Sequence, residues 1–175
     1  MSEIDAFIQW IVSLVSQNIY PGVFLAAIIE TVFPPIPSEV VFPLAGYSIL
    51  KNEMNVFHVV GVGITGGCGA TVGAFVIYII SKRLGRIGLI KYLKYAKIKE
   101  NSLKKADHWF EKYGDKSVII GRVIPGIREL VSIPAGIFNM NPIKFLIFTL
   151  IGSCIWSIAL TGAGYYFGIA TLNVF

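Results

Sequence analysis

Three long stretches of the chain contain no Asp, Glu, Lys or Arg, at residues 6–29, 54–81 and 145–175. An α-helix needs about 20 mainly apolar residues to cross a bilayer, and each stretch is longer than that. The pattern of hydrophobic positions therefore predicts transmembrane helices at 56–81 and 142–170.

Two other apolar segments are too interrupted by proline and glycine to cross as single helices. The first, 23–50, has three prolines between arms at 23–33 and 38–50, and the second, 117–140, has a Pro-Gly pair. Each arm of the first segment is too short as a helix to cross an apolar core of roughly 30 Å. Irregular backbone at membrane depth requires surrounding protein or a watery cavity. Both segments are predicted to be re-entrant hairpins, with turns at Pro35, Pro37, Pro125 and Gly126.

The two halves of the chain resemble each other. The motif IPSEVVFPLAG at 36–46 parallels IPGIRELVSIPAG at 124–136, and each hairpin precedes one long apolar helix. Because one membrane crossing separates the hairpins, the second must be inverted relative to the first. The predicted fold is an all-α polytopic membrane protein, an inverted repeat of two re-entrant helical hairpins each followed by a transmembrane helix. The single domain, 1–175, would comprise an amphipathic helix (4–20), a first repeat (22–81), a basic cytoplasmic loop (82–116) and a second repeat (117–170).

Composition and charge indicate a membrane protein and orient it. Hydrophobic residues make up 55% of the chain and charged residues 14%, with a mean hydropathy of +0.71. A soluble domain carries roughly 25% charged residues. The net charge is +5, but residues 82–116 hold eleven of the fifteen basic residues against four acids. The positive-inside rule puts this loop in the cytoplasm, where it faces anionic lipid rather than nucleic acid.

Two amphipathic helices are predicted outside the long apolar spans. Residues 98–113 place Leu103, Phe110 and Tyr113 on one face and lysines on the other. This pattern is typical of a helix that lies on the cytoplasmic leaflet. Residues 4–20 also alternate with helical spacing, and this helix either lies in the interface or crosses the membrane with its polar stripe facing protein.

Two arginines, Arg122 and Arg128, lie in the second interrupted segment. A cation at the bilayer centre costs about 3 kcal/mol on insertion scales, so such residues usually serve a function. Guanidinium groups bind phosphate through forked N–H bonds, and the backbone amides at the Pro-Gly break also favour an anion. We therefore predict a lipid-phosphate site at Arg122 and Arg128. The alternative is structural, with each arginine paired to Glu30, Glu39 or Glu129.

Glu30 and Glu39 flank the prolines of the first interrupted segment. Low dielectric favours the protonated form of a carboxyl group and a nearby arginine favours the ionised form, so the two can compete during transport. Both acids are predicted to couple proton movement to transport. For Glu39 the alternative is structural, because it opens an arm where an acid stabilises a helix N-terminus. Cys68 and Cys154 lie in apolar spans without metal-ligand spacing, and neither a metal nor a cofactor is expected.

Together these motifs resemble the DedA family, also known as the VTT or SNARE-associated domain. The resemblance rests on two acids around FPPIPSE, on R-x2-P-G-x-R followed by PAG, and on a Gly-rich C-terminal helix, over roughly residues 20–170. It implies two opposed re-entrant hairpins, residence in the bacterial inner membrane, and flipping or scrambling of lipids such as undecaprenyl phosphate or phosphatidylethanolamine. It also implies that the family's acidic pair corresponds to Glu30 and Glu39 and its arginine pair to Arg122 and Arg128.

The favoured hypothesis is a flippase that moves undecaprenyl phosphate across the cytoplasmic membrane, with proton coupling left open. A phosphatidylethanolamine flippase or scramblase and a proton-coupled small-ion exchanger are alternatives, as is a scaffold that shapes the bilayer. A membrane phosphatase is disfavoured because the sequence shows no catalytic Ser/His/Asp or Cys/His arrangement, so no enzyme activity is predicted. Membrane lipids and protons are the expected partners, and homo-oligomerisation is left open.

Overall fold

The computed structural model consists of helices throughout the part of the chain that it describes. The described residues are 13–15, 18–32, 38–95, 100–125, 127–128 and 130–172, and none of them lies in a strand. The all-α prediction is confirmed for these ranges. In chain order the helices are α2 (Ile19–Val32), α3 (Ser38–Lys51), α4 (Phe57–Tyr95), α5 (Glu100–Tyr113), the short 3-10 helix η1 (Gly114–Lys116), α6 (Ser117–Arg122), α7 (Ser132–Ile137) and α8 (Pro142–Leu172).

Helices α4 and α8 contain the two segments that are long and apolar enough to cross a membrane. The apolar part of α4, Phe57–Gly85, has 29 residues and a mean hydropathy of 1.7, and Pro142–Gly168 of α8 has 27 residues and a mean hydropathy of 2.0. The long apolar helices predicted at 56–81 and 142–170 are therefore confirmed.

Helix α4 extends beyond its apolar part into the basic segment. Backbone angles at Gly85 (φ 59°, ψ −168°) interrupt the helix, and helical backbone then continues to Tyr95. Glycine reaches such a positive φ readily because it has no Cβ. Segment 82–116 is thus helical over more of its length than predicted, since the lysines, arginines and leucines around Gly85 are good helix formers.

Helices α4 and α8 pack against each other in antiparallel directions through small residues. A methyl group added at Gly63 would lie 2.5 Å from Ile158 Cγ1, and one added at Gly67 would lie 2.8 Å from the Cα of Cys154. From Gly63 to Gly67 the residue number rises by four on α4, while the contacted residue on α8 falls by four, from Ile158 to Cys154. The two helices therefore run in opposite directions. Glycine on one helix lets the backbone of the other approach this closely.

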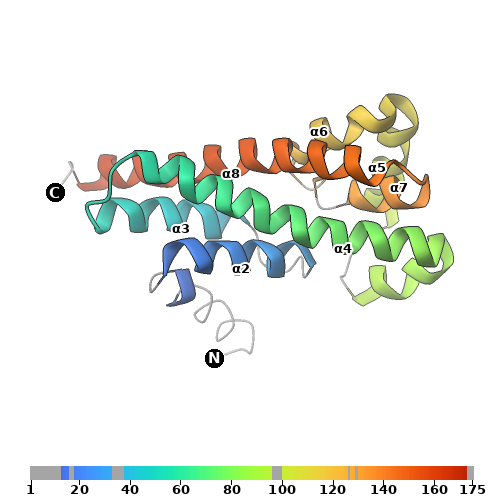
Figure 1. Cartoon of the computed structure of the whole chain (residues 1–175), viewed down its shortest axis with the longest axis horizontal. Coiled ribbons are helices and arrows are strands. Elements are labelled where there is room, and N and C mark those ends of the chain that lie inside the picture. The colour runs from blue at the N-terminus through green and yellow to red at the C-terminus, as the bar shows by residue number, and fades with distance from the viewer. Residues whose placement is uncertain are drawn as a thin grey trace.

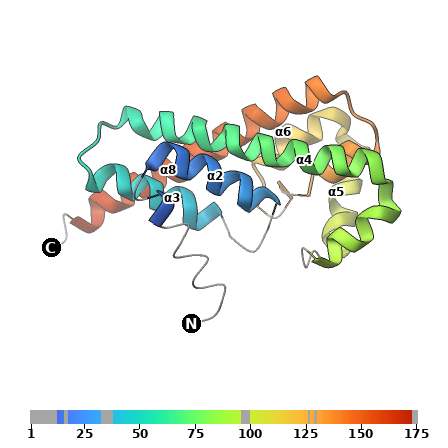
Figure 2. The same cartoon turned by 60° about the horizontal axis from the view of Figure 1, so that its bottom comes forward.

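The shorter helices cover this central pair in a reciprocal way. Helices α2 and α7 pack on α4, whereas α3 and α6 pack on α8. Figures 1 and 2 show the long antiparallel pair, with α2 and α3 along one end and α5, α6 and α7 gathered around the other. Each long helix therefore contacts one short helix from each half of the chain.

The two pairs of short helices differ in length. Helices α2 and α3 have 14 residues each, or about 21 Å, and they correspond to the predicted arms. Helices α6 and α7 have six residues each. Pro125 prevents α6 from continuing into the turn, and the chain turns after α7 at Asn139, whose φ of 54° is left-handed. Pro125 lies in the predicted turn. Pro35, Pro37, Gly126 and most of the helix predicted at 4–20 lie outside the described residues.

Helix α5 lies against the protein through Phe110. This side chain is 8% exposed and stacks on Phe138 with ring centroids 5.3 Å apart. Phe110 also belongs to a buried cluster with Tyr78 and Phe145. Within the helix predicted at 98–113, helical structure is found from Glu100 to Tyr113, and part of its apolar face is covered by protein. Its position on the cytoplasmic leaflet stays a prediction.

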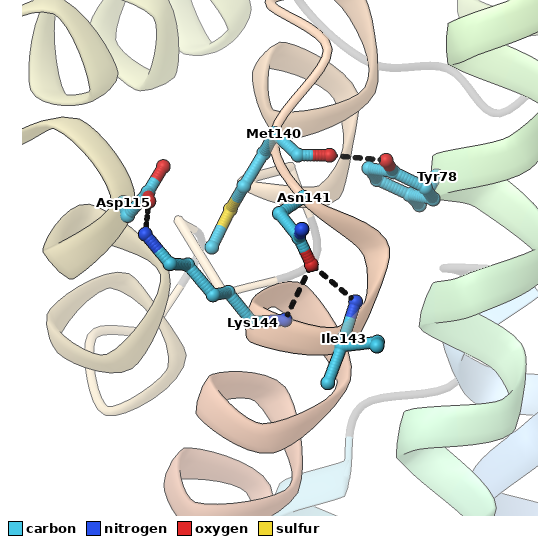
Figure 3. Close-up of polar contacts among 6 residues, drawn as sticks. All are labelled: Tyr78, Asp115, Met140, Asn141, Ile143 and Lys144. Atoms are coloured by element: carbon cyan, nitrogen blue, oxygen red, sulfur yellow. Dashed lines mark hydrogen bonds and ion pairs between the residues drawn. The ribbon is translucent and has the colours of Figure 1, made fainter.

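The start of α8 is fixed by polar contacts (Figure 3). The Asn141 side-chain oxygen accepts hydrogen bonds from the backbone N–H groups of Ile143, at 2.9 Å, and Lys144, at 3.3 Å. This is an N-cap followed by proline at the first helical position, where proline's missing N–H has no cost. The Tyr78 hydroxyl of α4 donates to the Met140 carbonyl, which ties the start of α8 to the other long helix.

The packing of α3 on α8 generates a prediction at two neighbouring glycines. A methyl group at Gly164 would lie well under 3.0 Å from the Pro43 backbone, whereas one at Gly162 would meet only Val59 Cγ1, at 3.7 Å. Gly164→Ala should lower stability by about 1–3 kcal/mol through overpacking. Gly162→Ala should be neutral or stabilising, since alanine favours helix over glycine by up to about 1 kcal/mol.

Thermal unfolding in detergent, followed by circular dichroism, measures both variants. Equal unfolding midpoints for the two variants would contradict the close approach of α3 and α8 at Gly164.

Candidate functional site

The described residues line a small cavity, with charged and hydroxyl side chains on its wall, at the meeting point of both halves of the chain. The space between the lining atoms is about 320 Å³ when the open solvent beside it is included, but the cavity itself is only about 10 Å³. That space is close to what a single water needs. The lining comes from α2 (Glu30, Thr31), α3 (Phe42), α4 (Ala70), α6 and the turn after it (Arg122, Arg128), and α8 (Ser153, Trp156, Ser157).

Arg128 and Glu30 form a buried ion pair in this cavity. The Arg128 Nη2–H donates to Glu30 Oε1, and the two residues are only 9% and 3% exposed. Val23, Ala26, Ala27 and Glu30 are buried on one face of α2, so the glutamate points inward with the helix's small apolar residues. Removing one partner of a buried pair typically costs about 3–5 kcal/mol, because the other charge stays buried.

Trp156 of α8 gives Arg128 a second contact. The guanidinium carbon of Arg128 lies over the Trp156 ring, 5.5 Å from its centroid. A cation placed over an indole face is attracted by the ring's quadrupole, most strongly where water is excluded. Arg128 therefore connects α2, through Glu30, with α8, through Trp156.

Arg122, which also lines the cavity, is held by different contacts. It is the last residue of α6 and 4% exposed, and its Nη2–H donates to the Ser132 hydroxyl at 2.7 Å. Its side chain crosses α8 at Gly152, where an added methyl group would lie 2.6 Å from Arg122 Cβ. The glycine thus leaves room for the arginine, and the serine sets its direction.

Three of the four charged residues predicted as site residues lie together. Arg122, Arg128 and Glu30 all line the cavity. Glu39 does not line it: this residue is exposed in the first turn of α3, where an acid favours the helix N-terminus. The Arg128–Glu30 pair is one of the pairings that the sequence left open, and Glu129 lies outside the described residues.

Sequence reasoning missed the neutral polar residues of the site. Ser153 and Ser157 are 5% and 1% exposed and are spaced one helical turn apart, with Trp156 beside them. Ser132 was also missed. A signal was present in the sequence: two serines spaced i, i+4 and a tryptophan lie inside an uncharged run. Polar side chains in such a run tend to face protein, so these residues could have been predicted to face the interior.

The arrangement is suited to an oxyanion. Two guanidinium groups and one carboxylate line the cavity, so its charged groups sum to a positive value when Glu30 is ionised. Serine hydroxyls on the same wall are neutral donors. Among the described residues no group of three or more His, Cys, Asp or Glu could hold a metal ion.

Known proteins resemble this chain over most of its length. The VTT domain family matches residues 36–166. "Undecaprenyl phosphate transporter A" of Staphylococcus aureus is 32% identical over 156 residues, which cover 87% of this chain and 75% of that protein. "Alkaline phosphatase-like protein" of Lactococcus lactis subsp. cremoris is 34% identical over 163 residues, covering 90% and 75%.

"Protein DedA" of Escherichia coli K12 is 29% identical over 170 residues, which cover 94% of this chain and 76% of that protein. No solved structure matches the chain. The family match and these relatives agree with the two long apolar helices and with the resemblance seen in the motifs. The chain therefore belongs to the DedA family of VTT-domain proteins and is an integral protein of the bacterial cytoplasmic membrane.

Proposed function

We propose that this protein is a transporter that moves a lipid phosphate, with undecaprenyl phosphate as its cargo, across the cytoplasmic membrane. The observation that carries the proposal is the pair of buried arginines, Arg122 and Arg128, which line one cavity between the long helices. The names of the Staphylococcus aureus relative and of a Bacillus subtilis relative, 35% identical over 149 residues, support transport of this lipid. Only the phosphate needs to enter the site, because the polyprenyl tail can stay in the bilayer.

Binding of a phosphate requires the cavity to open. The present space admits about one water, whereas a phosphate group brings four oxygens around phosphorus. Arg128 also donates to Glu30, so the phosphate must take over N–H groups that now face a carboxylate. We infer that the structure corresponds to a closed form in which Glu30 stands in for the lipid phosphate.

Exchange of partners at Arg128 explains why a proton would accompany the lipid. Once phosphate binds Arg128, the Glu30 carboxylate would lose the guanidinium N–H that it now accepts from, and a second anion would share its cavity. Repulsion between two buried anions favours the protonated acid, so the carboxyl group would take up a proton. The contact between Arg128 and Glu30 supports Glu30 for this role, and Glu39 stays a prediction from the sequence and the family resemblance.

The inverted repeat is proposed as the basis for access from both sides. In support, each half's first short helix packs on its own long helix and its second on the other half's. The glycines that end the two matched motifs behave alike, since Gly46 packs against the backbone of α8 at Thr161 and Gly136 against that of α4 at Tyr78. If the two halves alternately adopted each other's packing, the cavity would open first to one side of the membrane and then to the other.

A zwitterionic phospholipid is a second candidate cargo. Its phosphate would bind the arginines, and its ammonium group could replace the proton on Glu30. The buried carboxylate beside two guanidinium groups is the observation that favours this candidate. Phosphatidylethanolamine and polyprenyl phosphate therefore have to be compared in the same vesicles.

Loss of either arginine should slow lipid movement. A hydrogen bond to a charged group contributes about 1.5–3 kcal/mol, so Arg122→Gln and Arg128→Gln should each reduce the rate about 10- to 100-fold. Glu30→Gln should retain movement but lose its acceleration by a pH gradient. The measurement is flipping of a fluorescent polyprenyl phosphate in vesicles that contain purified protein.

Lys144→Gln is the matched control. Lys144 Nζ pairs with Asp115 at 3.3 Å, but the two side chains are 61% and 39% exposed, and such surface pairs contribute about 0–1 kcal/mol. Its flipping rate should stay within about twofold of wild type. If the arginine variants match Lys144→Gln, the phosphate site is in the wrong place. If only phosphatidylethanolamine moves, the cargo assignment fails.

The inverted arrangement also predicts which loops face which side. In a chain with Cys68→Ser and Cys154→Ser, a cysteine at Lys51 should react with an impermeant maleimide in intact cells. A cysteine at Lys116 should react only after permeabilisation, because α4 crosses the membrane between the two positions and basic segments stay in the cytoplasm. Both positions are exposed. Labelling of both from the same side would contradict the single crossing by α4.

A further inference from the structure

The Arg128 guanidinium contacts its two partners through different parts of the group. Its Nη2–H, on the edge of the planar guanidinium, donates to Glu30, while its central carbon lies over the Trp156 ring. A guanidinium carries five N–H donors, and the attraction between its charge and an aromatic ring does not require the donor that Glu30 occupies. A ligand that displaces Glu30 from the edge therefore need not displace Trp156.

The two partners also belong to different halves of the chain. Glu30 is on α2, and Trp156 is on α8 together with Ser153 and Ser157 of the cavity wall. If the carboxylate leaves, Arg128 stays attached to α8, beside two hydroxyl groups. The Trp156 Nε1–H is buried and meets no acceptor among the described residues, which leaves it able to donate to a ligand oxygen.

We propose that Trp156 is the positioning residue of the phosphate site, which holds Arg128 on α8 when the Arg128–Glu30 ion pair opens. This inference rests on the proposed function and deepens it. The ring is a partner that neither protonation nor an anion can remove, so the guanidinium stays aimed into the cavity through the exchange. The phosphate would then be carried on the α8 side, while α2 is released.

The test compares side chains that keep or remove the aromatic face. Trp156→Phe keeps a weaker face, and Trp156→Leu keeps apolar volume without one. Binding of farnesyl phosphate, a short polyprenyl phosphate, to purified protein in detergent is the readout. Affinity should fall in the order wild type, Trp156→Phe, Trp156→Leu, with about a tenfold loss for leucine. Equal affinities for the phenylalanine and leucine variants would overturn the proposal.

A double-mutant cycle with Arg128 separates positioning from packing. In an Arg128→Gln background, Trp156→Leu should cause a clearly smaller loss of affinity than in wild type, because the cation that the ring holds is gone. In a Glu30→Gln background the loss should be at least as large as in wild type, since Arg128 then lacks its carboxylate partner and depends more on the ring. An undiminished loss in the Arg128→Gln background would show that the ring only fills space.

Trp109→Leu is the matched control. Trp109 lies on α5, packs beside Tyr113 with ring centroids 4.9 Å apart, and does not line the cavity. Its replacement should leave farnesyl phosphate affinity unchanged, and a loss equal to that of Trp156→Leu would overturn the assignment.

If wild type neither binds nor moves the lipid, the proposed function fails, but the contact between Trp156 and Arg128 is not yet tested. A second measurement tests that contact without a ligand. Thermal unfolding in a Glu30→Gln background should show Trp156→Leu lowering the unfolding midpoint more with Arg128 present than with Arg128→Gln. Additive shifts would overturn the Trp156–Arg128 coupling itself.

Discussion

Two guanidinium groups buried among apolar helices are the constraint on which the rest of this structure depends. A cation in such surroundings persists only with compensating contacts, and each arginine has a different set. Arg128 has a carboxylate and an aromatic face, whereas Arg122 has the Ser132 hydroxyl and the space left by Gly152. These contacts bring α2, α6, α7 and α8 together. The interactions that form the cavity therefore also hold these helices in place.

Close helix packing supplies the low-dielectric surroundings that make those contacts strong. Gly63 and Gly67 bring α4 against α8, and Gly46 and Gly164 bring α3 against α8. Little water can enter a site enclosed this tightly, which strengthens every charge interaction inside it. The same packing limits the cavity to about one water, so the phosphate binding that we propose would require the helices to move.

Much of this arrangement could be predicted from the sequence, because the signals were local. Uncharged runs marked the two long helices, and charge inside apolar segments marked Arg122, Arg128 and Glu30. Trp156 and Ser132 could not be assigned, because their roles depend on contacts between distant segments. Glu39 shares the composition signal of Glu30 but sits at an exposed helix start, and sequence cannot tell which face of a short helix meets the core.

In the mechanism that we propose, Arg128 exchanges Glu30 for a lipid phosphate and Glu30 then takes up a proton. Infrared difference spectroscopy of the purified protein, with and without farnesyl phosphate, observes that carboxyl group directly. We expect a protonated carboxyl band to appear on binding in wild type and to be absent in Glu30→Gln. Binding of the phosphate with Glu30 still ionised would contradict the exchange.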